Sequence, residues 1–257
     1  MLLPTGEVSE RSSRALAAAS AAGIEVIIAS ARWSASAERV ARAIPGTKFV
    51  VACSGAQVRR LDDNLDLMDL RLPGLFTKAA IEICDGLGGT ATWVFDETTV
   101  VRMDEPRLPN AASPEMQFVH NISAVSYGPA RMAMIGAGET TDVIRRNLGA
   151  RWADQVEIVE ALASSGRTLV VMTAKGANKG TALLSACREL QITPAEVVAF
   201  GDSGNDLSMF AVAGASVAMG NGTHEAKSAA TFETLSNVHD GVAVVVERLL
   251  ATGRLGE

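Results

Sequence analysis

The chain of 257 residues has few aromatic side chains, few cysteines, no excess of positive charge and no long apolar run. Aromatic residues make up 4% of it and the formal net charge is -6, which together argue against a stacking platform or a nucleic-acid-binding face. Cys53, Cys84 and Cys187 have no paired spacing, so neither a zinc site nor a disulfide framework is predicted. No apolar run approaches the roughly 18 residues of a membrane span, and the N-terminus lacks the basic start and apolar core of a signal peptide. We therefore expect a cytoplasmic protein with no membrane and no nucleic-acid partner.

What the chain does contain is apolar sequence, since hydrophobic residues make up 48% of it. That is enough to bury a large core in one domain or in two. Short apolar strands alternate with helical patterns at both ends of the chain, which predicts an α/β fold with a parallel sheet covered by helices on both faces. The expected helices are residues 9–23, 34–44 and 179–190, and the expected strands are residues 25–30, 48–55, 168–173, 196–200 and 215–219.

The middle of the chain follows a different pattern. Between about Leu70 and Arg167, helical stretches at 72–88 and 139–149 flank alternating stretches such as "ATWVFDETTVVRM". Strands paired through turns, with helices on one side, would form an inserted α+β unit. We expect a core domain of residues 1–69 and 168–257, interrupted by an inserted domain of residues 70–167.

Three loops carry polar residues where ligands bind to open parallel sheets, at the carboxyl ends of strands. "IIASAR" ends a strand at Ser30, and Arg32 follows as a further candidate for binding phosphate. "GANKGTALL" opens a helix with Lys179. "FGDSGND" ends a strand with two carboxylates and an amide on one tight loop. If these loops converge, they form one cleft.

The combined side chains suit a phosphoryl group held beside Mg²⁺, a cation that prefers oxygen ligands from one or two carboxylates, water and phosphate. Asp202 is the expected direct ligand. Asp206, one helical turn later, would bind the ion through water or hold its hydration shell. Asn205 would donate to a phosphate oxygen, while Lys179 and Ser30 would neutralise and orient the remaining oxygens.

Each of these residues also has an ordinary structural interpretation. An aspartate between a strand and a helix, such as Asp202, often caps the helix. Ser30 alone would be a loop serine, and Lys179 alone a solvated charge, although a cation at the start of a helix opposes the helix dipole. The complete acidic string, with its glycines and its Asn-Asp pair, favours the metal and phosphate site.

The strings "VIIASAR", "KGANKGTALL", "FGDSGNDLSMF" and "VAMGNGTHEAKSAATFETLSNVHDGVAVVVERLL" resemble those of Cof-type phosphatases, a branch of the haloacid dehalogenase superfamily with a large inserted cap. "FVVACSGAQV" resembles the place where that family leaves its core for the cap. The resemblance implies a Rossmann-like core, dependence on Mg²⁺ and hydrolysis of small phosphate monoesters, often sugar phosphates. We expect a small phosphorylated metabolite as partner and a monomer or homodimer.

Two departures from the family pattern bear on activity. Ser30, Ala31 and Arg32 stand where the family usually has threonine, glycine and arginine, so a hydroxyl is retained. Family members also begin with a strand that ends in an aspartate, followed two residues later by a second acid. A glycine, a threonine and usually a pair of leucines follow that motif. This chain opens "MLLPTGEVSERS", so the resemblance aligns Leu2 and Leu3 just after the motif, with Met1 in place of its threonine. We therefore expect the first strand, the nucleophilic aspartate and the acid/base aspartate to be absent.

A start site assigned too late and a genuine short form would both produce this beginning. Three functions consequently stay open. The first is a Mg²⁺-dependent phosphatase by lineage, impaired in this chain. The second is a protein that binds phosphate esters or Mg²⁺ without turnover. The third is a phosphotransferase related to phosphomannomutases, which would also need the missing aspartate.

Overall fold

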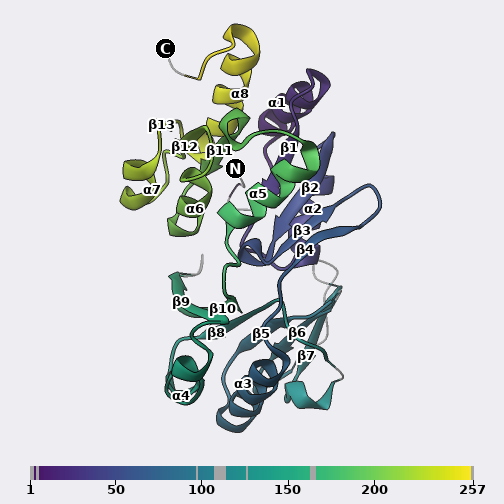
Figure 1. Ribbon diagram of the computed structural model, residues 1–257, viewed down its shortest axis with the longest axis vertical. Helices are drawn as coiled ribbons and strands as arrows, with labels where there is room; N and C mark the ends of the chain where they lie inside the picture. The colour runs from purple at the N-terminus through teal and green to yellow at the C-terminus, as the bar shows by residue number, and fades with distance from the viewer. Residues whose placement is uncertain are drawn as a thin grey trace. The chain divides into compact units, whose positions relative to one another are not determined.

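The computed structural model describes residues 3, 6–96, 98–106, 114–125, 127–162 and 166–255. The chain divides into two compact units, labelled by element in Figure 1. Unit 1 comprises Met1–Ala31, Ala37–Met68 and Asn178–Glu257, and unit 2 comprises Arg32–Ser36 and Asp69–Ala177. Of the residues that the resemblance aligns at the N-terminal motif, Met1 and Leu2 lie outside the described residues. No helix in the described ranges is long and apolar enough to cross a membrane.

Unit 1 contains the alternating strands and helices that the sequence predicted at both ends of the chain. Its strands are β1 (Val26–Ala29), β2 (Thr47–Ala52), β3 (Gln57–Arg60), β4 (Asp66–Asp69, whose last residue belongs to unit 2), β11 (Val198–Gly201), β12 (Ala215–Ala218) and β13 (Phe232–Glu233). Its helices are α1 (Glu10–Ala21), α2 (Ser34–Arg42, which begins in the segment grouped with unit 2), α5 (Lys179–Leu190), α6 (Leu207–Phe210), α7 (His224–Ala229) and α8 (Gly241–Thr252).

The strands of unit 1 form two sheets, whereas the sequence predicted one. The first sheet has the order β1-β2-β3-β4, and the second has the order β11-β12-β13. β1 is parallel to β2, and all strands of the second sheet are parallel. β3, which the sequence did not predict, runs antiparallel to β2. The expected parallel pairing is therefore present in both sheets, with an antiparallel hairpin added to the first.

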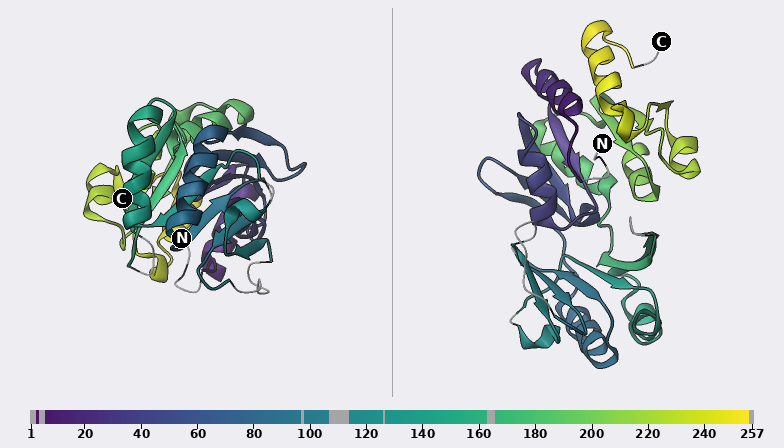
Figure 2. Two further views of the ribbon diagram at one scale, coloured as in Figure 1. Left: turned by 90° about the horizontal axis from the view of Figure 1, so that it is seen from below. Right: turned by 180° about the vertical axis from the view of Figure 1, so that it is seen from behind.

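The helices of unit 1 bury small side chains against these sheets. α1 begins where predicted, because the Ser9 side chain caps it by accepting a hydrogen bond from the Ser12 amide at 3.1 Å. Figure 2 shows α1 beside α8, the last helix of the chain. α5 packs Ala182 and Ala186 against Val51 and Val58 of the first sheet. This close packing fixes the start of α5 near the carboxyl ends of the strands.

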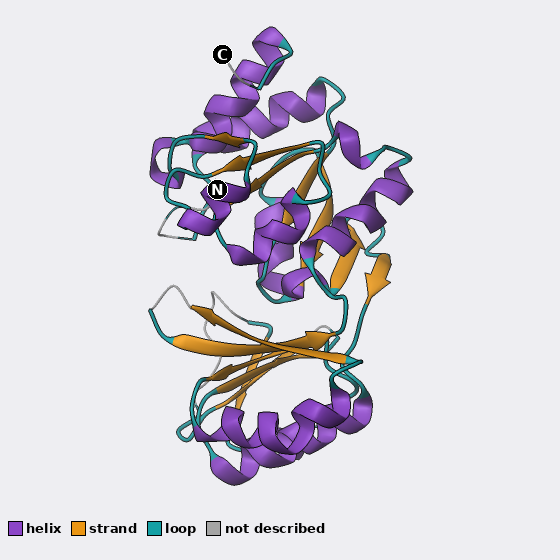
Figure 3. Cartoon of the chain, turned by 60° about the vertical axis from the view of Figure 1, so that its left-hand side comes forward, coloured by secondary structure: helices purple, strands orange, loops and turns teal. Residues whose placement is uncertain are grey.

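Unit 2 is built on a sheet of mixed direction with the order β7-β6-β5-β8-β10-β9. The strands are β5 (Ala91–Val94), β6 (Thr99–Arg102), β7 (Met116–Val119), β8 (Met132–Gly136), β9 (Val156–Leu162) and β10 (Thr168–Ala174). The predicted helices are present as α3 (Gly74–Leu87) and α4 (Glu139–Ile144), and both cover the same face of the sheet (Figure 3). Phe76 and Ile81 of α3 share one apolar core with Trp93, Ile135 and Met172 of the strands.

β10 differs from the sequence prediction, which assigned residues 168–173 to the sheet of the first domain. In the structure β10 pairs antiparallel with β8 on one side and with β9 on the other. Residues 168–173 belong to unit 2 because β10 pairs along its whole length with β9 and because Val170 and Met172 are buried in the core of unit 2. Unit 2 consequently continues to Ala177.

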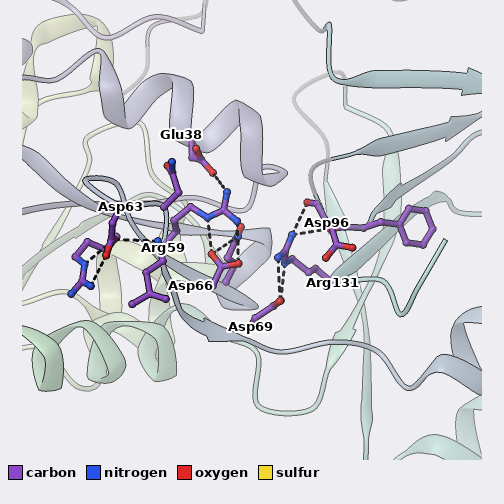
Figure 4. A network of polar contacts seen from close by, with 12 residues as sticks. Glu38, Arg59, Asp63, Asp66, Asp69, Asp96 and Arg131 are labelled. Atoms are coloured by element: carbon purple, nitrogen blue, oxygen red, sulfur yellow. Dashed lines mark hydrogen bonds and ion pairs between the residues drawn. The ribbon is translucent and has the colours of Figure 1, made fainter. Parts of the chain in front are cut away.

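Buried arginines brace a carboxylate in each unit, as Figure 4 shows. In unit 1, Arg59 donates to both carboxylate oxygens of Asp66, at 2.6 and 3.0 Å. In unit 2, Arg131 donates to both carboxylate oxygens of Asp69, at 2.7 and 3.1 Å. Burial works to raise the pKa of Asp69, but hydrogen bonds from Arg131 and Arg71 outweigh it and lower that pKa. Each buried arginine is therefore paired with a carboxylate, and its charge is not left without a partner.

Candidate functional site

The acidic loop that follows β11 is held in shape by its own last residue. Oδ2 of Asp206 accepts hydrogen bonds from the backbone amides of Asp202 at 2.9 Å and of Ser203 at 3.1 Å. Asp206 is buried, with 3% of its surface exposed. A Cβ atom at Gly201 would lie 2.4 Å from Cβ of Asp206, so the turn requires glycine at the end of the strand. The loop therefore folds around the Asp206 carboxylate.

Lys179 meets this loop from the first residue of α5. Its Nζ donates to Oδ1 of Asp206 at 2.5 Å and to Oδ1 of Asn205 at 3.1 Å. Lys179 is 6% exposed, so the ion pair is almost completely removed from water. With Oδ1 of Asn205 turned to the lysine, the amide nitrogen of that side chain is its donor end, which suits an acceptor such as a phosphate oxygen.

The sequence around Lys179 explains how the lysine reaches the loop. Asn178 caps α5 by accepting from the Thr181 amide at 2.9 Å. A Cβ at Gly180 would lie 2.3 Å from the backbone oxygen of Ser208, so glycine lets α5 approach α6 closely. The Gly180 amide also donates to Oγ of Ser208 at 3.1 Å. Lys179 is thus positioned by the residues on both sides of it.

Asp202 differs from Asp206 in that it is exposed. Its backbone oxygen accepts from the Thr223 amide at 2.9 Å, and Gly222 lies against its backbone. The side chain is consequently attached to a well-held backbone while its carboxylate faces solvent. Of the two acids in the loop, Asp202 is the one placed to meet an added cation.

Ser30 and Arg32 were the remaining predicted residues. Ser30 directly follows β1, and its amide donates to the Val51 carbonyl at 2.9 Å, which fixes it at the carboxyl end of that strand. Arg32 belongs to the segment Arg32–Ser36 that is grouped with unit 2. The contacts described above therefore join the lysine loop to the acidic loop, while Ser30 lies at the end of β1, in the other sheet of unit 1.

The residues fit a magnesium ion through one carboxylate rather than through a complete protein cage. Within the described residues, no three side chains of histidine, cysteine, aspartate or glutamate converge as a metal-binding group. Both oxygens of Asp206 are already engaged by Lys179 and by loop amides. One exposed carboxylate, such as that of Asp202, is compatible with Mg²⁺, since this ion is often bound by one or two carboxylates with water and substrate phosphate completing the shell.

The sequence reasoning did not identify Ser208 and Thr223 as supports of the site. Thr223 lies in "NGT", a string that also matches a glycosylation sequon. Its place just before a helical stretch was the available signal, because the Thr223 hydroxyl caps α7 by accepting from the Ala226 amide. Ser208 carries no comparable signal, since its contact with Gly180 depends on how two helices approach.

Comparison with known proteins supports the same type of α/β fold. A crystal structure of a haloacid dehalogenase-like hydrolase from Bacteroides thetaiotaomicron superimposes with a TM-score of 0.82 at 22% identity, covering 96% of this chain and 95% of that one. The family model described as haloacid dehalogenase-like hydrolase matches residues 1–246 of this chain. The chain therefore belongs to the haloacid dehalogenase-like hydrolase family, in its Cof-type branch.

Curated relatives include two phosphatases of Bacillus subtilis (strain 168). The chain is 26% identical over 242 residues to 5-amino-6-(5-phospho-D-ribitylamino)uracil phosphatase YcsE, covering 93% of this chain and 87% of that protein. It is 41% identical over 91 residues to 5-amino-6-(5-phospho-D-ribitylamino)uracil phosphatase YwtE, covering 35% of this chain and 32% of that protein. The second match thus spans about a third of that relative's length.

Proposed function

We propose that the chain is by lineage a Mg²⁺-dependent phosphatase of small phosphate monoesters, sugar phosphates among them, and that residues 1–257 by themselves hydrolyse them poorly. The observation that carries this proposal is the buried contact of Lys179 with Asp206 and Asn205, beside the exposed carboxylate of Asp202. A cation, an amide donor and a carboxylate at the end of a parallel strand suit a phosphate ester.

In this proposal the residues have separate roles. Asp202 would hold Mg²⁺, which when bound supplies positive charge to the phosphate oxygens. Lys179 stabilises negative charge on the phosphoryl group, and Asn205 and Ser30 orient its oxygens. Asp206 keeps Lys179 and the loop amides in place and so supports the metal ligand. Arg32 is a further candidate for contact with phosphate.

Low turnover follows from the chemistry that these residues lack. Resemblance to the family implies that an aspartate attacks phosphorus and that a second acid protonates the leaving oxygen and then activates water. Neither a lysine ion-paired with Asp206 nor a carboxylate holding a cation replaces that nucleophile. Loss of a nucleophile costs on the order of 10⁴-fold in turnover. We infer that none of the site residues described above takes the place of these two acids.

Unit 2 would then be the cap that selects the substrate, and unit 1 the core that binds phosphate. The sequence predicted a core of residues 1–69 and 168–257; we place the end of the cap at Ala177, where unit 2 ends, so that β10 belongs to the cap and the core resumes at Asn178. The names of YcsE and YwtE make a phosphorylated ribityl compound a reasonable member of the substrate panel.

The experiment compares the chain with a version extended at its N-terminus by a strand ending in Asp-x-Asp. Hydrolysis of 4-nitrophenyl phosphate in Mg²⁺ is measured for both, and we expect the extension to raise turnover by about 10⁴-fold. A control extension with both added aspartates changed to asparagine keeps the strand and should stay at the level of the short chain. If the extended protein were as inactive as the short one over a broad panel of phosphate monoesters, the proposed phosphatase function would be wrong.

The competing function is binding without turnover, and it is favoured by the observation that the described residues contain no group of three or more histidine, cysteine, aspartate or glutamate side chains placed to hold a metal ion. It predicts that the chain binds inorganic phosphate in a Mg²⁺-dependent way, and that the extension changes this binding but produces no hydrolysis. Isothermal titration calorimetry on the same two proteins distinguishes this function from the phosphatase.

A further inference from the structure

The turn between β2 and β3 holds its backbone in a conformation that side chains rarely adopt. Cys53 and Ser54 have φ angles of 52° and 58°, and Gly55 has a φ of 100°. Cys53 and Gly55 are also buried. Left-handed backbone at residues other than glycine is unfavourable, and it persists only where the surrounding structure fixes it, often at functional sites. Another part of the protein therefore holds this turn in place.

The start of α5, which belongs to the same unit, packs against this turn. A Cβ atom at Gly55 would lie 2.3 Å from the carbonyl carbon of Asn178, 2.4 Å from its oxygen and 2.7 Å from the amide nitrogen of Lys179. All three are main-chain atoms, so no side chain could move aside to make room. Glycine at position 55 thus lets the turn contact the backbone at the residue where the helix begins.

The same hairpin also holds Ser30. The Ser30 amide donates to the carbonyl of Val51 at 2.9 Å, and Val51 lies in β2 shortly before the turn. Val51 and Val58, on either side of the turn, pack against alanines of α5. The hairpin of β2 and β3 consequently holds both Ser30, through its first strand, and the start of α5, through its turn.

We propose that Gly55 is a positioning residue for the phosphate site, because its contact with the start of α5 sets where the Lys179 ammonium group lies relative to Ser30. The ammonium group has little freedom to adjust by itself, since Lys179 is buried and its Nζ donates to Oδ1 of Asp206 at 2.5 Å. A displaced start of α5 would therefore draw Nζ away from the acidic loop. The roles of Ser30 and Lys179 towards phosphate rest on the proposed function, whereas the position of the ammonium group does not.

Gly55→Ala adds the single carbon that this contact excludes, and Gly23→Ala is its matched control. Gly23 has a similar φ of 85°, but a Cβ there would meet nothing within 4 Å. Both substitutions therefore strain the backbone, and only Gly55→Ala should displace α5. The measurement is NMR of the isotopically labelled full chain, in which the ammonium signal of Lys179 is assigned by its loss in Lys179→Met.

The ammonium protons of Lys179 should respond to one substitution and not to the other. We expect their exchange with water to be about tenfold faster in Gly55→Ala, because a buried, hydrogen-bonded group exchanges only when the local structure opens, and to stay within about twofold of the parent in Gly23→Ala. Isothermal titration calorimetry with inorganic phosphate and Mg²⁺ should show about tenfold weaker binding in Gly55→Ala alone, since the cation is misplaced.

A second variant decides the question if Gly55→Ala does not fold. A glycine inserted between Ser54 and Gly55 lengthens the turn and should leave the valines of β2 and β3 packed against α5. The close contact with the start of the helix is lost, so the ammonium protons of Lys179 should again exchange about tenfold faster than in the parent.

The failure of this proposal and the failure of the proposed function give different results. The proposal is overturned if Gly55→Ala, or the insertion variant in its place, keeps the parent's exchange rate, or if Gly23→Ala speeds the exchange equally. If the parent binds no phosphate while Gly55→Ala still frees the ammonium group, the positioning role stands and the proposed phosphate site fails. If the parent binds phosphate and Gly55→Ala changes neither that binding nor the ammonium signal, the phosphate site stands and the positioning role is refuted.

Discussion

Replacing Asp206 with alanine tests the inference that this residue holds the site together. The substitution removes the partner of Nζ of Lys179 at 2.5 Å and the acceptor for the amides of Asp202 and Ser203 at 2.9 and 3.1 Å. Because the lysine side chain is 7% exposed, its charge stays buried without a counter-charge. Breaking a buried ion pair by removing one partner costs about 3–5 kcal/mol, and we expect a loss in this range for Asp206→Ala.

The reverse substitution, Lys179→Met, should cost less. It leaves the Asp206 carboxylate with its two amide donors, so a loss of about 1–3 kcal/mol is expected. The double variant should be less destabilised than the sum of the single variants by about 2 kcal/mol, which is within the range of coupling energies between contacting residues. Urea unfolding followed by circular dichroism gives the free energy of unfolding for each protein.

A matched control pair lies on the surface of the same unit. Lys227 and Glu233 approach to 3.6 Å with side chains 31% and 56% exposed. Lys227→Met should change the free energy of unfolding by less than about 1 kcal/mol, since exposed ion pairs contribute little. If Asp206→Ala cost no more than Lys227→Met, or if the effects of Lys179→Met and Asp206→Ala were additive, the buried pair would not organise the site.

Two further predictions concern unit 2. Arg131→Met should lower the free energy of unfolding by about 3 kcal/mol, because this arginine is 2% exposed and is paired with Asp69. Arg71→Met removes a more exposed partner of the same carboxylate and should lower it by about 1 kcal/mol. Urea titrations measure both changes. Burial raises the pKa of Cys84 from 9.0 to about 12. Because this pKa is higher in the folded state, the stabilising effect of the protonated thiol is complete below pH 9.0 and is lost as the pH rises toward about 12. Cys84→Ala should therefore flatten the decline of the free energy of unfolding at alkaline pH. The Cys84 thiol should also resist alkylation until the protein unfolds.

Local chemistry made parts of the fold predictable from sequence. The start of α1 followed from Ser9 as a capping residue, and the start of α5 near Lys179 followed from the loop before it. The acidic loop after β11 was also expected, because glycines and acids follow a short apolar run there. Each of these features depends on residues close together in the chain.

Features that depend on distant partners were not predictable in the same way. The apolar run of β10 does not reveal whether its neighbours are parallel strands of unit 1 or the antiparallel strands β8 and β9. The sequence "GDSGND" likewise does not reveal which acid faces inward. In the structure, Asp206 is buried against Lys179 and holds the loop, while Asp202 is exposed.

The central claim is tested most directly by Asp202→Asn in the extended protein, with Mg²⁺-dependent turnover and thermal melting measured together. Asp202 is exposed, and its backbone rather than its side chain makes the contact with Thr223, so the substitution should shift Tm by no more than about 2 °C. Asparagine is a neutral and much weaker ligand for Mg²⁺, so turnover should fall to the background of the short chain. A protein that kept the turnover and the Mg²⁺ dependence of the extended parent would contradict the assignment of Asp202 as the metal ligand and would remove the main support for a phosphatase site.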